Sequence, residues 1–140
     1  MKNFKFAFVI FPCLMLSIYA CKKEVVGDQE FVQNHFVGKW PLKSLVEIKV
    51  ENGDTTINDT TLYSPIDTLY FTADGNYTKG NDNAKYSIDA TGENLTIATT
   101  PAVNWFIKHL RQNSIVLSQE RTETVANKKI IYYTEENLVK

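Results

Sequence analysis

After residue 37, apolar and polar side chains alternate with a period of two, and this alternation limits what the chain can fold into. In residues 40–50 we expect one face to carry Trp40, Leu42, Ser44, Val46, Ile48 and Val50. The other face carries Lys39, Lys43, Glu47, Lys49 and Glu51, with Pro41 and Leu45 as exceptions. Such alternation predicts a long, half-buried β-strand with one side in water. Because Pro41 has no N–H group to donate, the start of this strand should be unpaired or at an edge.

Shorter alternating segments follow, separated by turn signals. We expect strands at residues 68–72, 77–79, 84–88, 95–97, 103–110, 114–120 and 128–134. The sequence Ala73-Asp74-Gly75-Asn76 predicts a tight hairpin, and the polar residues 51–65 predict a connection. A count of about eight short, regularly spaced strands predicts an all-β sandwich or barrel. The one helical turn that we expect lies between Asp28 and Phe36, with Asp28 as a candidate N-cap.

The first twenty residues differ in kind from the rest of the chain. Lys2 and Lys5 give a positive start, an apolar run extends from Phe6 to Ile18, and the small residue Ala20 precedes Cys21. This combination defines a secretory signal peptide. A membrane-spanning helix would need about 20 apolar residues, which is more than this run supplies. We therefore expect this segment, residues 1–20, to be removed from the mature protein.

Cys21 is the candidate site of lipid attachment. The sequence Ile18-Tyr19-Ala20-Cys21 resembles a lipobox, at which a bacterial lipid is attached to the cysteine thiol. Cys13 is lost with the signal peptide, so Cys21 has no disulfide partner in the mature chain. We expect Cys21 to carry acyl chains such as palmitate. Residues 21–35 then form a lipidated tether, and residues 36–140 form the folded domain.

The mature chain is mildly acidic. Lys2 and Lys5 account for two of the 15 basic residues, so 13 basic residues face 16 acidic ones and the net charge is −3. No basic patch stands out in the sequence, and nucleic acid is therefore not an expected partner. A chain of this length buries a core without cross-links, as a domain lacking disulfides must.

Several motifs resemble those of lipocalin-like domains in lipoproteins of gram-negative cell envelopes. Gly38-Lys39-Trp40 resembles the Gly-x-Trp that opens the first lipocalin strand, and residues 69–77 look like the Phe-x-x-Asp-Gly-x-Tyr hairpin of these domains. Residues 94–97 and the pair Ile107 and Leu110 are similar in position, so that the resemblance spans Phe36 to Tyr133. It implies a small antiparallel up-and-down β-barrel of about eight strands. It also implies an outer-membrane location and a first tryptophan that plugs the barrel base, whereas Pro41 departs from the pattern.

No catalytic or metal-binding constellation is recognisable in the sequence. The two histidines, His35 and His109, have no companion at ligand spacing. Residues 81–83 are Asn-Asp-Asn, as in a calcium loop, but the loop lacks its closing glutamate. The paired carboxylates, such as Glu135 and Glu136, predict solvated charges rather than a general acid and base. We expect neither enzymatic activity nor a cofactor nor a metal.

The aromatic residues on the predicted strands are the candidates for a ligand cavity or for the barrel interior: Trp40, Phe71, Tyr86 and Trp105. Two functional hypotheses follow. In the first, the membrane-anchored barrel binds a small hydrophobic or amphipathic ligand, for which a cavity of about 300 Å³ or more is needed. In the second, a filled barrel docks on another envelope protein as an interaction module or inhibitor. A filled interior together with an exposed apolar patch would favour the second hypothesis.

Three Asp-Thr sequences, at residues 54–56, 59–61 and 67–69, resemble an O-glycan acceptor used in some gram-negative envelopes. The simpler interpretation is a polar segment rich in threonine and aspartate.

Overall fold

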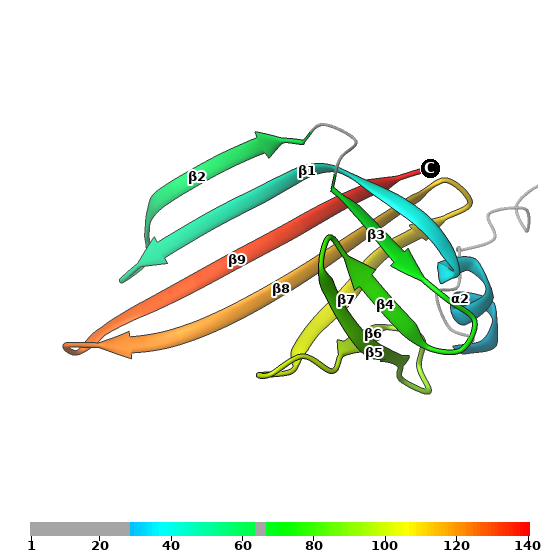
Figure 1. Cartoon of the computed structure of the whole chain (residues 1–140). Helices are drawn as coiled ribbons and strands as arrows, with labels where there is room; N and C mark the ends of the chain where they lie inside the picture. Colours follow the sequence, from blue (N-terminus) through cyan, green and yellow to red (C-terminus); the bar gives the residue numbers. More distant parts are fainter. Residues whose placement is uncertain (1–28, 64–66) are drawn as a thin grey trace, which may run out of the picture.

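The computed structural model describes residues 29–63 and 67–140 (Figure 1). In this part of the chain, one short helix precedes a series of antiparallel strands. The elements are α2 (Gln29–Phe36), β1 (Gly38–Glu51), β2 (Asp54–Leu62), β3 (Thr68–Phe71), β4 (Asn76–Lys79), β5 (Asp82–Ile88), β6 (Asn94–Ile97), β7 (Val103–Arg111), β8 (Ser114–Val125) and β9 (Lys128–Val139).

The strands form an up-and-down barrel. They pair in the order β2-β1-β3-β4-β5-β6-β7-β8-β9, and β1 also pairs with β9. This last pairing closes eight strands into a barrel and leaves β2 outside it, paired to the second half of β1. The predicted fold class, a small antiparallel up-and-down barrel, is confirmed. The predicted hairpin at residues 73–76 joins β3 to β4, with φ of 73° at Gly75.

The prediction of a polar connection at residues 51–65 is wrong, because most of this segment is strand β2. Asn52 and Gly53 have φ angles of 53° and 94°, and a hairpin turn with two positive φ angles favours this dipeptide. The turn pairs Glu51 with Asp54 and continues as far as Ser44 and Leu62. All nine residues of β2 are exposed. The strand therefore lacks the alternation of apolar and polar residues by which a half-buried strand is predicted.

The prediction that the alternate residues from Trp40 to Val50 share one face is wrong, because a β-bulge lies near the start of β1. Leu42 pairs with Leu138, but Ser44 pairs with the next residue of β9, Asn137. The extra residue shifts the alternation by one position. Leu42 therefore lies inside the barrel, whereas Val46 and the apolar positions after it lie on the face that continues the barrel exterior. We call this the outer face, and the opposite one the inner face.

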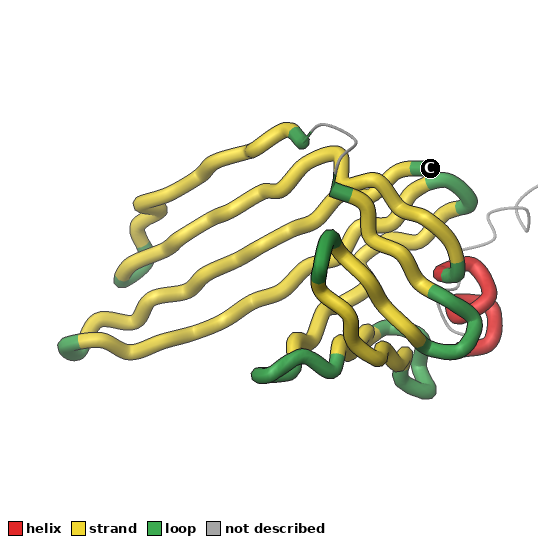
Figure 2. Tube along the Cα trace, viewed as in Figure 1, coloured by secondary structure: helices red, strands yellow, loops and turns green. Residues whose placement is uncertain are grey.

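A cluster of buried side chains lies inside the barrel. One cluster of buried residues contains Val32, Phe36, Trp40, Leu42, Leu69, Phe71, Tyr77, Tyr86, Ile88, Leu95, Ile97, Ile107, Leu110, Ile115, Leu117 and Leu138. Helix α2 closes one end of the barrel (Figure 2), with Val32 and Phe36 completely buried. Trp40 is also completely buried and donates its indole N–H to the Phe36 carbonyl oxygen at 2.7 Å. Most of this helix falls within residues 21–35, the expected tether, but it packs as part of the barrel domain.

The two tryptophans should differ in their contribution to stability. Trp40 is completely buried, whereas Trp105 is only partly buried against the same core. We expect Trp40→Ala to lower the free energy of unfolding by about 3–5 kcal/mol, and Trp105→Ala to lower it by less. Urea unfolding followed by circular dichroism measures both values. A loss for Trp105→Ala that matched that of Trp40→Ala would contradict the described packing.

Candidate docking surface

The four aromatic residues predicted for a cavity or for the barrel interior all lie at strand positions whose side chains face inward. Trp40 and Phe71 are completely buried, and Tyr86 is 6 % exposed. The rings of Phe71 and Tyr86 meet edge to face at 5.0 Å between centroids. Trp105 pairs across the ladder with the buried Leu95 and is partly exposed. At the end of the barrel that contains these aromatic residues, the protein's own side chains therefore occupy the interior.

An ion pair with a buried carboxylate and a partly exposed lysine lies farther along the barrel. Lys79 on β4 and Glu136 on β9 approach to 2.8 Å, and Glu136 is 7 % exposed. Burial raises the pKa of the neighbouring Tyr77 above its ordinary value, and the negative charges of Glu136 and Asp82 add to this effect. Sequence reasoning missed the pair because its partners are 57 residues apart. Within residues 29–63 and 67–140, every buried side-chain polar atom has a hydrogen-bond partner, so this cluster is internally satisfied.

The histidines do not form a metal site. The Nδ1 atom of His35 lies 2.8 Å from the Phe31 carbonyl oxygen of its own helix, and His109 pairs with Val116 on β8. In the part of the chain that the structure describes, no group of three or more histidine, cysteine, aspartate or glutamate side chains is placed to hold a metal ion.

The most unusual surface of the molecule is a sheet that protrudes beyond the barrel. Strands β2, β1, β9 and β8 continue side by side well past the point where β3 leaves β1 (Figure 1). In Figure 2 no described helix or strand covers this part of the sheet, and the extensive contacts of its strands are with neighbours in the same sheet. No other described layer therefore covers either face. A sheet normally buries at least one face against another layer.

Pairing across the ladder shows which side chains share the outer face of this sheet. The centre of this face is apolar, and we call its residues the outer patch: Val46, Ile48 and Val50 of β1, with Ile131 and Tyr133 of β9. Polar residues flank the patch on both sides, namely Asn58 and Thr60 of β2 and Glu120 and Thr122 of β8. An apolar centre with a polar rim is the usual anatomy of a protein–protein interface.

An ion pair fixes the border between the outer patch and the barrel. Lys108 Nζ lies 2.8 Å from Glu135 Oε2, and the Tyr133 hydroxyl donates to the same oxygen at 2.7 Å. Burial on its own would raise the pKa of Glu135, but the hydrogen bonds from Lys108 and Tyr133 more than offset it and the pKa is lowered. Glu135 is therefore a carboxylate at neutral pH and holds the Tyr133 ring at the edge of the patch.

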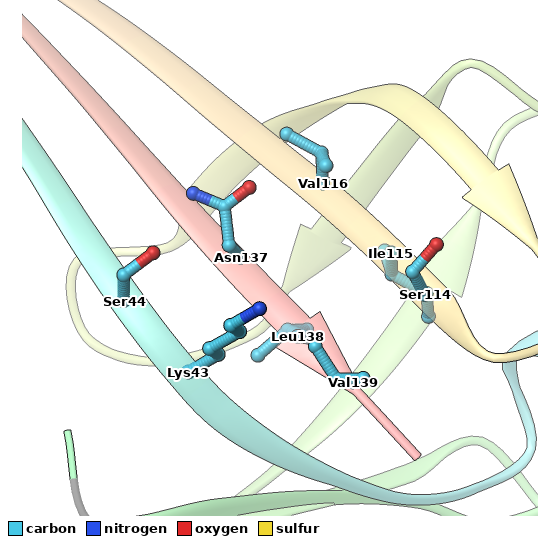
Figure 3. Close-up of a pocket in the computed structure, with 8 residues that line it drawn as sticks. All are labelled: Lys43, Ser44, Ser114, Ile115, Val116, Asn137, Leu138 and Val139. Carbon is cyan, nitrogen blue, oxygen red and sulfur yellow. The ribbon is translucent and has the colours of Figure 1, made fainter. Parts of the chain in front are cut away.

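A shallow depression adjoins the outer patch. It has a volume of about 390 Å³ and is lined by Lys43, Ser44, Ser114, Ile115, Val116, Asn137, Leu138 and Val139 (Figure 3). It lies over β1, β9 and β8 at the bulge of β1, where Ser44 and Asn137 are opposite each other. The outer surface is thus hollowed beside the patch, on the side toward the barrel.

The inner face of the protruding sheet is charged. The Tyr132 ring lies between two cations, with Arg121 at 4.7 Å and Lys49 at 5.8 Å from its centroid. These cations form ion pairs with Glu51 and Glu123 of their own strands. The two faces therefore differ in chemistry: the outer face is apolar at its centre, and the inner face carries charges around Tyr132.

Comparison with known proteins gives no relative: no protein family, curated protein or solved structure matches this chain. The predicted signal peptide and the predicted lipid site Cys21 lie outside the described residues. Thr55 and Thr60, from two of the Asp-Thr sequences, are exposed on β2.

The contrast between the two faces of β1 can be tested by stability. Ile48 lies in the outer patch, where neighbours within the sheet are its only described cover, whereas Leu42 is 2 % exposed inside the barrel. We expect Ile48→Thr to lower the free energy of unfolding by less than about 1 kcal/mol and Leu42→Ala to lower it by about 2–5 kcal/mol. Equal losses in chemical denaturation would show that the alternation continues through residue 43 without a bulge.

Proposed function

We propose that this protein is a lipid-anchored interaction module of the cell envelope, which docks on another envelope protein through the outer patch. One observation carries the proposal: an apolar centre with a polar rim lies uncovered on the protruding sheet, while a cluster of buried side chains packs inside the barrel. Of the two hypotheses drawn from the sequence, this combination favours the interaction module.

The size of the outer face is consistent with this role. The paired segments of β1 and β2 run over eight residues of β1, and the sheet is four strands wide. At about 3.4 Å per residue and 4.8 Å between strands, such a face measures roughly 500 Å². A standard interface buries about 800 Å² on each partner. The face alone therefore supplies roughly 500 Å² on this side, about the lower bound for a specific interface, which is about 1,000 Å² counted over both partners.

Lipid anchoring at Cys21 places the module at a membrane, and we propose the outer membrane of the cell envelope as its location. The sequence Ile18-Tyr19-Ala20-Cys21 supports this proposal. Within the described residues no helix has the length and apolar composition to cross a bilayer. One acyl chain binds a membrane only marginally, so stable residence needs a second signal or more chains.

The anchor is tested by Cys21→Ser. We expect this variant to take up no fatty-acid analogue and to keep its signal peptide, because both steps need the thiol. Labelling in cells followed by mass spectrometry of the purified protein measures both results. Incorporation of label into the variant would refute attachment at Cys21.

The docking surface is tested by photo-crosslinking in the cells that make the protein. A photoreactive phenylalanine analogue replaces Ile48 in the outer patch or, as the matched control, the exposed Lys85 on β5. We expect a discrete crosslinked partner protein with the probe at position 48 and none with the probe at position 85.

Two results would contradict the proposal. One is the same crosslinks from both positions. The other is no crosslink together with a small hydrophobic molecule that co-purifies with the protein, which would instead favour the ligand-binding hypothesis.

A further inference from the structure

Strand β2 has one unpaired edge. It pairs with β1 on one side and is the end strand of the described sheet. The Tyr63 N–H donates to the Lys43 carbonyl oxygen at 3.0 Å, so it points toward β1. Because antiparallel strands alternate in this respect, the N–H and C=O groups of Asn58, Thr60 and Leu62 point to the free edge. The Thr60 N–H donates to the Asp59 carboxylate, and the other groups form a template for one more strand.

This edge lacks most of the features that keep natural sheet edges from pairing. Such edges are commonly protected by lysine, by proline or by a covering element. Strand β2, Asp54–Leu62, contains neither lysine nor proline, and all of its residues are exposed. Its bulge lies at Thr56, where Lys49 pairs with Ile57 and Val50 with Thr55, and the ladder beyond it runs regularly to Leu62.

The inner face beside this edge carries an unfavourable arrangement of charge. Glu47 of β1 lies directly opposite Asp59 of β2, and Glu51 lies opposite Asp54. Like charges opposite each other destabilise a sheet. Lys49 forms an ion pair with Glu51, but no described cation pairs with Glu47 or Asp59. The Asp59 carboxylate instead accepts the Thr60 N–H at 2.8 Å, which brings it toward the free edge.

We propose that the free edge of β2 accepts an extended segment of a partner protein as an additional strand, with lysine or arginine side chains of that segment facing Asp59 and Glu47. The inference rests on the proposed interaction function and names its chemistry. Backbone hydrogen bonds supply the pairing, as in other cases of strand addition, and side chains at alternate positions supply the specificity. The partner's cations remove the repulsion between the acidic pair.

The register of β2 defines the partner segment further. The N–H of Asp59 points toward β1, so an antiparallel strand at the free edge meets Asp59 in a non-hydrogen-bonded pair, where side chains approach most closely. The alternate positions of that strand lie on the outer face beside Thr60 and Leu62. The segment is therefore one in which basic residues alternate with β-branched ones. A second copy of β2 cannot supply it, because Asp54–Leu62 contains no basic residue.

The test uses the full chain in detergent and a labelled eight-residue peptide in which lysine alternates with valine. We expect saturable binding by fluorescence anisotropy. A peptide with glutamate in place of lysine should bind at least about tenfold more weakly. A lysine peptide methylated on alternate backbone nitrogens should not bind, because it cannot complete the ladder.

Two double variants, each of which removes two negative charges, distinguish local pairing with the peptide from general electrostatic attraction. Glu47→Gln combined with Asp59→Asn should weaken binding of the lysine peptide about tenfold, because the peptide loses its cross-strand charge pair with Asp59 and the longer-range attraction of Glu47. Asp74→Asn combined with Glu93→Gln, two exposed acidic residues outside the protruding sheet, should change it less than twofold. Thermal melting should show the first variant to be at least as stable as the wild type, because the acidic pair is removed.

The proposal would be overturned if the glutamate peptide or the methylated peptide bound as tightly as the lysine peptide. It would also be overturned if both double variants lost the same amount of affinity for the lysine peptide. Self-association of the chain that blocks peptide binding would also overturn it. Crosslinking from position 48 with no peptide binding would refute the strand-addition site and leave the interaction function intact. Absence of both would refute the interaction function as well.

Discussion

The structure depends on the pairing of β1 with β9, which closes the barrel and also continues beyond it. The first residues of β1, Gly38–Pro41, pair with β3 inside the barrel wall. From Leu42 to Glu51 the strand pairs with β9 along one edge, and from Ser44 onward it pairs with β2 along the other edge. A strand of fourteen residues is longer than the barrel wall requires. The surplus length produces the protruding sheet, so the candidate surface is a direct consequence of barrel closure.

The bulge between Leu42 and Ser44 decides which chemistry each side of that sheet presents. Without it, Val46 and Ile48 would follow Leu42 onto the inner face, and the lysines and glutamates of β1 would lie outside. One extra residue reverses this arrangement, because side chains alternate strictly along a strand. The outer face becomes apolar at its centre, and the inner face gathers the charges around Tyr132. A single backbone irregularity therefore creates the difference between the two faces.

Local signals in the sequence predicted the barrel strands and the long strands that extend beyond it, whereas strand β2 and the assignment of side chains to the two faces escaped prediction for physical reasons. The hairpin at Gly75 and the buried position of Trp40 follow from turn chemistry and alternation that short windows reveal. Strand β2 carries no burial pattern, and its one clear signal is the turn dipeptide Asn52-Gly53. The bulge and the contact between Lys79 and Glu136 depend on residues far apart in sequence, which periodicity cannot reveal.

The uncovered sheet also bears on where function resides in a barrel of this size. Small barrels either fill their interior with side chains or hold one small ligand. Here the aromatic residues Phe36, Phe71 and Tyr86 pack on one another where helix α2 closes the barrel, and the Lys79–Glu136 ion pair is satisfied farther along. Evacuating such an interior for a ligand would sacrifice packing that a marginally stable domain needs. Binding on the protruding sheet disturbs none of these contacts. The fold thus separates the residues that stabilise it from the surface that is free to evolve specificity.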